Sequence, residues 1–243
     1  MQRWPILVIS LSFCCAASVY GQTVNEAGMS TRENELKQEQ VLKAGIQLIK
    51  DRRPADAIKD DFDKVIASYE TSHPADTNVS TYCARNASES LAYLVQSTAA
   101  KKNAVVVGTV WCDAYFLRAY GLTELGRTAE ARQSLEKAIA MAPRNSQYIS
   151  ELSNLYSRDK KWDEAIAGYD TAARLARESS PPASRNGDLG RALRGKGYAL
   201  VELGRLDEAE AIYRQCLEID AADKAAQREL QYVQTRREQK TVQ

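Results

Sequence analysis

Gly126-Arg127-Thr128-Ala129-Glu130-Ala131 is a stretch whose pattern recurs twice, as Lys160-Lys161-Trp162-Asp163-Glu164-Ala165 and as Gly204-Arg205-Leu206-Asp207-Glu208-Ala209. The closing alanines of the first two stretches are 34 residues apart, and those of the second and third are 44 apart. A constant period of about 20 to 50 residues is typical of proteins that stack one small structural unit. We interpret the extra ten residues of the second interval as an inserted loop at 180–189, because a run rich in Ser and Pro lies there.

Each period carries the pattern of two helices. Bulky residues such as Leu193, Leu200 and Leu203 recur at helical spacing and would line one face of a helix. Gly126 and Gly204 suit the left-handed position that ends a helix. Small residues stand where helices of stacked pairs would approach closely, at Ala119, Ser153, Gly197, Ala131, Ala165 and Ala209. A lone helix pair cannot bury its apolar face, whereas stacked pairs bury it continuously.

This unit resembles the tetratricopeptide repeat, a 34-residue helix–turn–helix whose pattern runs from an aromatic residue through Leu-Gly and Tyr to Ala, an aromatic residue and Pro. The resemblance is carried by Tyr115, Ala119, Leu122, Ala131, Leu135 and Pro143, by Ile149, Leu152, Ser153, Tyr156, Ala165 and Tyr169, and by Leu193, Gly197, Leu200, Ala209 and Tyr213. Arg118 and Lys196 stand where the family has Leu. The resemblance implies an all-α fold, an α-solenoid of antiparallel helix pairs wound as a right-handed superhelix. Its units would span 112–145, 146–179 and 190–223, with a polar capping helix at 224–237.

The first residues have the layout of a secretory signal. Arg3 supplies a positive charge, Ile6 to Val19 is an uncharged and mostly apolar run, and Gly21 offers a small residue at a cleavage site. We expect residues 1–21 to be a cleaved signal peptide, residues 22–35 to be a flexible start of the mature chain, and the protein to be periplasmic or secreted by a bacterium. No membrane insertion is expected after cleavage. An uncleaved anchor is the alternative, although the run is shorter than the roughly 20 residues of a spanning helix.

The segment 36–110 is predicted to be helical but carries no clear repeat. Apolar residues from Val41 to Ile49 and from Ala57 to Tyr69 are spaced as in two helices. This pair is a candidate degenerate repeat at 36–70. A polar loop with Pro74 follows, and another helix is expected from Ala84 to Ala100.

Export would place the cysteines of the mature chain in an oxidising compartment, where disulfides form. They are Cys83, Cys112 and Cys216, and their odd number leaves one thiol unpaired. A repeat array brings mainly sequence neighbours together, which favours a disulfide between Cys83 and Cys112. Three separate buried cysteines are the alternative.

No motif predicts a catalytic residue, a cofactor or a metal. The segment 190–197 imitates a phosphate-binding loop, but Gly197 stands where such a loop has Ser or Thr, and no apolar strand precedes it. His73 is the only histidine, and no nucleophile motif lies near it. The acidic run 60–63 lacks the spacing of a calcium loop, and the chain has no Cys-x-x-Cys pair. With a net charge of +1 and no basic stripe, no nucleic acid is expected as a partner.

A protein or peptide partner would bind the concave face, which the first helices of stacked pairs line. Residues at i, i+4 and i+8 share a helix face, and this spacing predicts a peptide-binding groove of Phe116, Tyr120, Ser150, Asn154, Arg158, Arg191, Arg194 and Tyr198. Tyr rings offer rigid contact area, an Asn amide both donates and accepts, and arginines pair with carboxylates. We therefore predict a non-catalytic interaction module or scaffold. The alternatives are a self-associating structural oligomer and an enzyme with its site in the N-terminal helical region.

Overall fold

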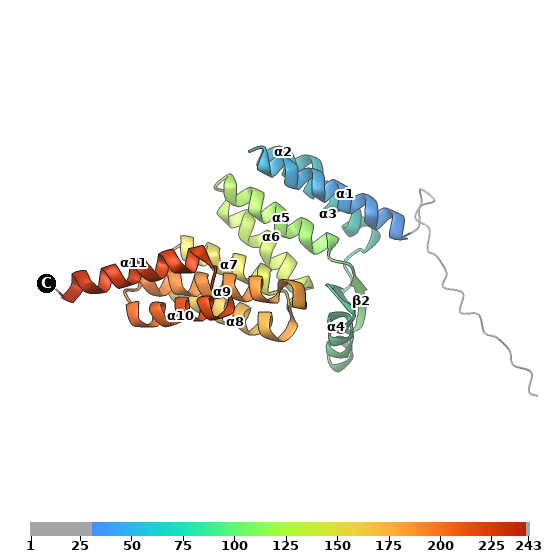
Figure 1. The fold of residues 1–243 in the computed structure, drawn as a ribbon. Coiled ribbons are helices and arrows are strands. Elements are labelled where there is room, and N and C mark those ends of the chain that lie inside the picture. Colours follow the sequence, from blue (N-terminus) through green and yellow to red (C-terminus); the bar gives the residue numbers. More distant parts are fainter. Residues whose placement is uncertain (1–30, 242–243) are drawn as a thin grey trace, which may run out of the picture. The chain divides into compact units, whose positions relative to one another are not determined.

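The computed structural model describes residues 31–241 (Figure 1). The features described below belong to one compact unit, which begins at Lys37. The predicted signal peptide at 1–21 lies outside the described residues. Helix α1 (Thr31–Lys50) already begins within the segment 22–35, so the prediction of a flexible chain is wrong for residues 31–35. Glu33 and Glu35 are good helix formers, and α1 continues into an apolar face on which Leu42 is buried and Val41, Leu48 and Ile49 are partly buried.

The elements follow one another with short turns. After α1 comes an uninterrupted helical stretch made of α2 (Pro54–Asp56), the π-helical segment η1 (Ala57–Phe62) and α3 (Asp63–Ser72). A strand–helix–strand segment follows, made of β1 (Val79–Cys83), α4 (Ala87–Ala99) and β2 (Asn103–Val107). The remaining helices are α5 (Val110–Glu124), α6 (Thr128–Met141), α7 (Ser146–Arg158), α8 (Trp162–Ser179), α9 (Pro182–Glu202), α10 (Leu206–Ile219) and α11 (Lys224–Thr241). Between residues 31 and 241, no helix is long and apolar enough to cross a bilayer.

Helices α5 to α10 form an all-α solenoid of helix pairs. The pairs are α5 with α6, α7 with α8 and α9 with α10, and α6 contacts α7 while α8 contacts α9. Helix α11 packs on α10 and α9 at the end of the row. The small residues singled out in the sequence all lie buried between helices: Ala119, Ser153, Gly197, Ala131, Ala165 and Ala209. Close approach between stacked helices is therefore the reason for their size.

The turns inside the pairs share one backbone geometry. Gly126 and Gly204 both have a φ of 73°, the left-handed conformation that glycine adopts without strain. Lys160 takes the corresponding place in the middle pair, with a φ of 58°. The glycines that the sequence marks as helix ends therefore are helix ends.

The two charged residues that depart from the repeat pattern have partners on neighbouring helices. Arg118 donates from Nε to Oδ1 of Asp63 over 2.7 Å. Lys196 donates from Nζ to Oδ1 of Asp170 over 2.6 Å. Both side chains therefore bridge helices where the family has an apolar contact.

The same substitution is expected to have opposite effects on stability at two glycines of α9. A Cβ on Gly197 would lie 2.7 Å from Cε1 of Tyr213, whose ring is fully buried, whereas a Cβ on Gly187 would meet nothing within 4 Å. We expect Gly197→Ala to lower the free energy of unfolding, because overpacking costs about 1–3 kcal/mol and exceeds the gain in helix propensity. Gly187→Ala is the matched control and should raise it by about 0.5–1 kcal/mol. Urea unfolding of both variants checks this, and an equal rise in both would contradict the packing argument.

The N-terminal part is not purely helical, which corrects the prediction for 36–110. β1 and β2 pair in parallel, with Val79 beside Asn103 and Cys83 beside Val107, and α4 connects them. The run that ends at Val107 is apolar, short and β-branched, and such a run has the same apolar pattern in a strand and in a buried helix. The strand partner decides between them, and that partner lies some twenty residues away.

The predicted inserted loop at 180–189 is also wrong, because α9 begins at Pro182 and only Ser180 and Pro181 are left between α8 and α9. Proline suits the first turn of a helix, since its missing N–H has no intrahelical partner there. Asp188 and Leu189 are buried, so this turn has a packing role. The ten extra residues therefore lengthen a helix pair.

The added turn of α9 and the end of α8 meet the strand–helix–strand segment at Arg85, whose side chain is 15% exposed. Arg85 donates to Oε1 of Glu89 and to the backbone carbonyls of Arg144 and Ser179, and its Nη1 lies 3.9 Å from Oδ2 of Asp188. The side chains of Glu89 and Asp188 are less than one-tenth exposed. Ser180 donates to Asp188 over 2.7 Å. This cluster, which we call the Arg85 cluster, fixes α4 against the solenoid.

A covalent bond ties the same segment to α5. Cys83 at the end of β1 and Cys112 in the first turn of α5 form a disulfide, with Cα atoms 6.2 Å apart. Cys216 is a free, buried cysteine, and its burial raises the pKa of the thiol to about 11. Of the two arrangements that the sequence left open, the structure has the disulfide.

Candidate functional site

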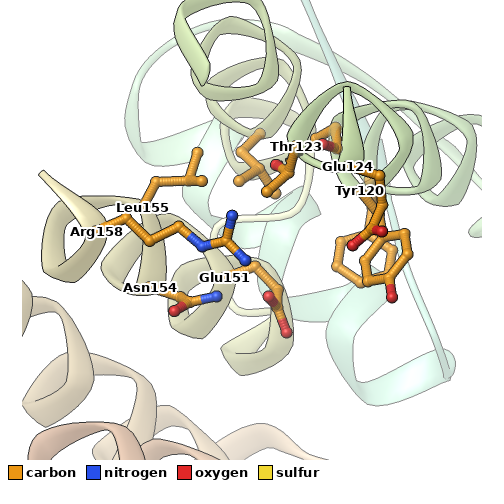
Figure 2. Close-up of a pocket in the computed structure, with 10 residues that line it drawn as sticks. Tyr120, Thr123, Glu124, Glu151, Asn154, Leu155 and Arg158 are labelled. Atoms are coloured by element: carbon orange, nitrogen blue, oxygen red, sulfur yellow. Dashed lines mark hydrogen bonds between the residues drawn. The ribbon is translucent and has the colours of Figure 1, made fainter. Parts of the chain in front are cut away.

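The first helices of the pairs, α5, α7 and α9, share one side of the solenoid, which we call the lead-helix face. Between α5 and α7 it contains an open hollow of about 50 Å³ (Figure 2). The hollow is lined by Phe116, Ala119, Tyr120, Thr123, Glu124, Leu135, Glu151, Asn154, Leu155 and Arg158. Its α5 side offers two aromatic rings beside the carboxylate of Glu124, and its α7 side offers the Asn154 amide with the charged groups of Glu151 and Arg158. Such a hollow has the size of part of one side chain.

Four of the eight predicted groove residues line this hollow. They are Phe116 and Tyr120 of α5 and Asn154 and Arg158 of α7. Tyr120 is 47% exposed, although it is a large aromatic residue. Phe116 stacks on Tyr148 with ring centroids 5.2 Å apart, so its ring is held from behind.

A buried hydrogen-bonded pair of side chains next to Phe116 holds the α5 side of the hollow in place. The hydroxyl of Tyr148 donates to Oδ1 of Asp113 over 2.6 Å. Burial raises the pKa of Asp113, against the hydrogen bonds from Tyr148 and Thr109 that lower it. Because the Tyr148 ring cannot move without breaking this bond, the α5 wall of the hollow is preorganised.

Glu151 is a site residue that the sequence pattern did not predict. Burial raises the pKa of this carboxyl, while the charge of Arg191, a hydrogen bond from Asn154 and the charge of Arg158 lower it. Arg191 Nη1 lies 3.9 Å from Glu151 Oε1, across the α7–α9 boundary. Figure 2 shows Glu151, Asn154 and Arg158 projecting from α7 into the same space. The sequence did contain a signal for Glu151. It precedes Asn154 by three residues, and residues three or four apart are neighbours on a helix.

Ser150 is not a groove residue. Its side chain is buried at 2% exposure, and its hydroxyl has no hydrogen-bond partner. The prediction placed it in the row at i, i+4 and i+8, but this row drifts by about 80° over eight residues, because a helix has 3.6 residues per turn. Ser150 therefore falls on the packed side of α7, and Glu151 takes its place.

The predicted residues of α9 lie apart from the hollow. Arg191 reaches toward it through Glu151, as described above. Arg194 forms an ion pair with Asp223, which caps α11, so this arginine holds the end of the solenoid. Burial alone would raise the pKa of Asp223, but the N–H of Ala226 and the Arg194 guanidinium lower it.

Exposed tyrosines continue along the lead-helix face beyond the hollow. Tyr198 of α9 is 47% exposed and meets Trp162 edge to face, with centroids 6.1 Å apart. Tyr232 of α11 is 49% exposed and follows Tyr198 by 34 residues, the period of the repeat. The sequence pattern suggested only a capping role for α11, although the period predicts that Tyr232 continues the row of Tyr120 and Tyr198.

His73 lies among aromatic side chains, away from the hollow. His73 stacks near Tyr69 and Trp111, and its Nδ1 lies within hydrogen-bond distance of Ser72 and of a backbone carbonyl. From residue 31 to residue 241, no group of three His, Cys, Asp or Glu side chains is arranged to hold a metal ion.

Comparison with protein families assigns the helix pairs. A tetratricopeptide repeat model matches residues 113–145, and a second one matches residues 146–222. Residues 113–222 are therefore similar to tetratricopeptide repeats. The matched residues span α5 to α10, so the hollow lies between the first helices of two successive matched units. Neither match reaches the candidate repeat at 36–70 or the strand–helix–strand segment.

Several solved structures are similar to part of this chain. The first TPR of Spaghetti (RPAP3), bound to the HSP90 peptide SRMEEVD, is 22% identical, with a TM-score of 0.44 over 51% of this chain and 90% of that chain. The N-terminal domain of stress-induced protein-1 (STI-1) from C. elegans is 17% identical, with a TM-score of 0.45 over 51% and 94%. MamA AMB-1 is 16% identical, with a TM-score of 0.47 over 83% of each chain. No curated protein sequence matches this chain.

Proposed function

We propose that this chain is a non-catalytic protein-interaction module that holds an extended peptide segment on the lead-helix face of its tetratricopeptide repeats. The observation that carries the proposal is the hollow between α5 and α7, where residues of two successive repeats converge around an open space. A side chain of the partner would enter this hollow, and the flanking backbone would run across α7 toward α9.

The lining suits a peptide because each kind of group in it meets one part of a polypeptide. Phe116 and Tyr120 offer aromatic surface to a side chain of the partner. Asn154 can donate to a backbone carbonyl and accept from a backbone N–H through one amide. Arg158 is exposed and can pair with a carboxylate of the partner, while Glu151 is already flanked by Arg191.

The proposed place of action is the bacterial periplasm or the outside of the cell. The disulfide between Cys83 and Cys112 supports this, because disulfides persist in oxidising compartments and are rare in the cytosol. The signal-like sequence at 1–21 agrees with it.

We expect a display library of random peptides to yield a consensus that binds the purified protein through the hollow. Asn154→Ala should weaken binding of the consensus peptide about tenfold or more, because a peptide backbone loses a buried hydrogen-bond partner worth about 1–2 kcal/mol. Tyr120→Ala should act similarly by removing exposed aromatic contact area. Fluorescence anisotropy with the labelled consensus peptide measures both effects.

The matched control for Tyr120→Ala is Leu125→Ala, which removes an exposed side chain from the same turn region outside the hollow. It should leave the dissociation constant unchanged. If Tyr120→Ala and Asn154→Ala keep their helicity and bind the peptide as the unaltered chain does, the hollow is not the binding site.

A further inference from the structure

The strand–helix–strand segment ends in a strand with one unpaired edge. In the described chain the sheet has only the two strands β1 and β2, and β1 is the one that lies against α5 and α6. Asn103 N–H donates to the carbonyl of Asn78 over 3.1 Å, and the carbonyl of Val107 accepts from Ala84 N–H over 3.0 Å. Peptide groups of successive residues point to opposite sides of a strand, so those of Ala104 and Val106 point away from β1. An extended chain placed there would find two unused N–H groups and two unused carbonyls.

The edge lacks the features that proteins use to keep an edge strand from pairing. Natural edges carry a charge, a proline or a bulge, or another element covers them. Residues 103–107 read Asn-Ala-Val-Val-Val and contain none of these, and Val105 is 37% exposed. The β-branched residues also favour the extended conformation that a new neighbour needs.

Helix α4 adds an apolar surface on the same outer side. Glu89 and Tyr93 of α4 face the solenoid, where Glu89 meets Arg85 and the Tyr93 hydroxyl accepts from the N–H of Arg144. Successive residues advance by about 100° around a helix, which turns the next stripe away from the solenoid. This stripe is Leu91, Leu94 and Val95, which are 64%, 43% and 61% exposed. Val105 points to the other face of the sheet, because its β1 partner Thr81 is next to Tyr82, which stacks on Tyr93 of α4. The stripe and Val105 are four of the ten large apolar side chains that are exposed in the described part of the chain.

We propose that this surface is a dimer interface, in which β2 of one copy pairs antiparallel with β2 of a second copy of this chain. A two-fold axis would pass beside Val105 and set Ala104 opposite Val106 of the other copy. The two strands would make one sheet with the order β1, β2, β2, β1. A two-stranded sheet alone is only marginally stable, and three or more strands are needed for independent stability. Each copy would therefore supply the additional strands that the sheet of the other copy lacks.

Charge favours a second copy as the occupant. Neither the strand nor the stripe carries a charge, and the single charged residue of α4, Glu89, is buried with Arg85. In the antiparallel register, Lys101 and Lys102 of one copy would lie opposite Thr109 and Gly108 of the other, so no like charges would meet. An acidic partner would meet only Lys101 and Lys102, which precede the strand, and no charge in the strand or the stripe.

The spacing of the helices also fits. Strands in a sheet lie about 4.8 Å apart, and α4 lies over both β1 and β2. An axis perpendicular to the sheet keeps both α4 helices on one face and places their axes about 10 Å apart, which is a normal distance for packed helices. The stripes of the two copies would then flank one another over the joined sheet.

Sedimentation velocity on the purified chain tests the proposal. We expect a concentration-dependent dimer, with half-dissociation at about 100 μM or below, as for a small interface. Leu91→Lys with Leu94→Lys should abolish it by placing charges in the stripe. The matched control is Leu125→Lys with Leu203→Lys, which adds the same charges at apolar positions of the solenoid that are 40% and 39% exposed, and it should still dimerise.

A cysteine at the axis tests the register. The peptide groups of Val105 face β1, so the two copies of this residue would form a non-hydrogen-bonded pair with Cα atoms about 4.5 Å apart, within the range of a disulfide. Val105→Cys should therefore give a covalent dimer on a non-reducing gel, and Ala129→Cys, at an exposed position of α6, should not. The proposal is overturned if the chain stays monomeric at about 100 μM. It is also overturned if the double lysine variant of α4 still forms the dimer. Both outcomes count against it even if another molecule binds this surface.

Discussion

Arg85→Met is expected to lower the free energy of unfolding by about 3–5 kcal/mol, the usual effect of leaving one member of a buried ion pair without its partner. The Glu89 carboxylate would lose the guanidinium that faces it, although the backbone N–H of residue 85 would still donate to it over 2.8 Å. The carbonyls of Arg144 and Ser179 would lose a donor as well. Urea unfolding followed by circular dichroism measures the change.

Arg174→Met is the matched control. Arg174 and Glu178 are also four residues apart, with Nη1 2.7 Å from Oε2, but both side chains are about half exposed. Exposed ion pairs contribute about 0–1 kcal/mol to stability, so this variant should lower the free energy of unfolding by no more than that. A double variant that replaces Arg85 and Glu89 with Met should lose less than the sum of the single effects, because the two groups interact directly. Equal effects of Arg85→Met and Arg174→Met would show that the Arg85 cluster does not hold the segment.

Removal of the disulfide is the second change with a large expected effect. Cys83→Ala with Cys112→Ala should cost about 3–4 kcal/mol, because the bond closes a loop of 29 residues and limits the freedom of the unfolded chain. The same loss should follow when the unaltered chain is unfolded in the presence of a reductant. Thermal and urea unfolding, with and without the reductant, measure it.

The double alanine variant should no longer respond to reductant. Cys216→Ala serves as the control, since Cys216 is a free thiol whose pKa is raised by burial, so that the reactive thiolate is rare at neutral pH. This control should keep the full response to reductant. An unaltered chain whose stability does not change on reduction would contradict a disulfide between Cys83 and Cys112.

The candidate site shows which side-chain positions a repeat pattern predicts and which it does not. The period of 34 residues predicts that Phe116, Tyr120, Asn154 and Arg158 share one face, and in the fold they line one hollow. The same pattern puts Ser150 in the groove and omits Glu151, because a stripe read as i, i+4 and i+8 departs slowly from the true helical period. Fine placement of a side chain around a helix needs the neighbouring helix to be known.

By itself, the sequence determined the solenoid of α5 to α10, because each unit packs mainly on the next one along the chain and repeats its small and apolar residues at one period. The tertiary structure alone decided the strand–helix–strand segment and the helical form of 182–189. Both depend on partners far along the chain: β1 needs β2, and Arg85 needs Arg144, Ser179 and Asp188. A buried charge or a short apolar run takes its conformation from such distant neighbours, and no local pattern records which ones they are.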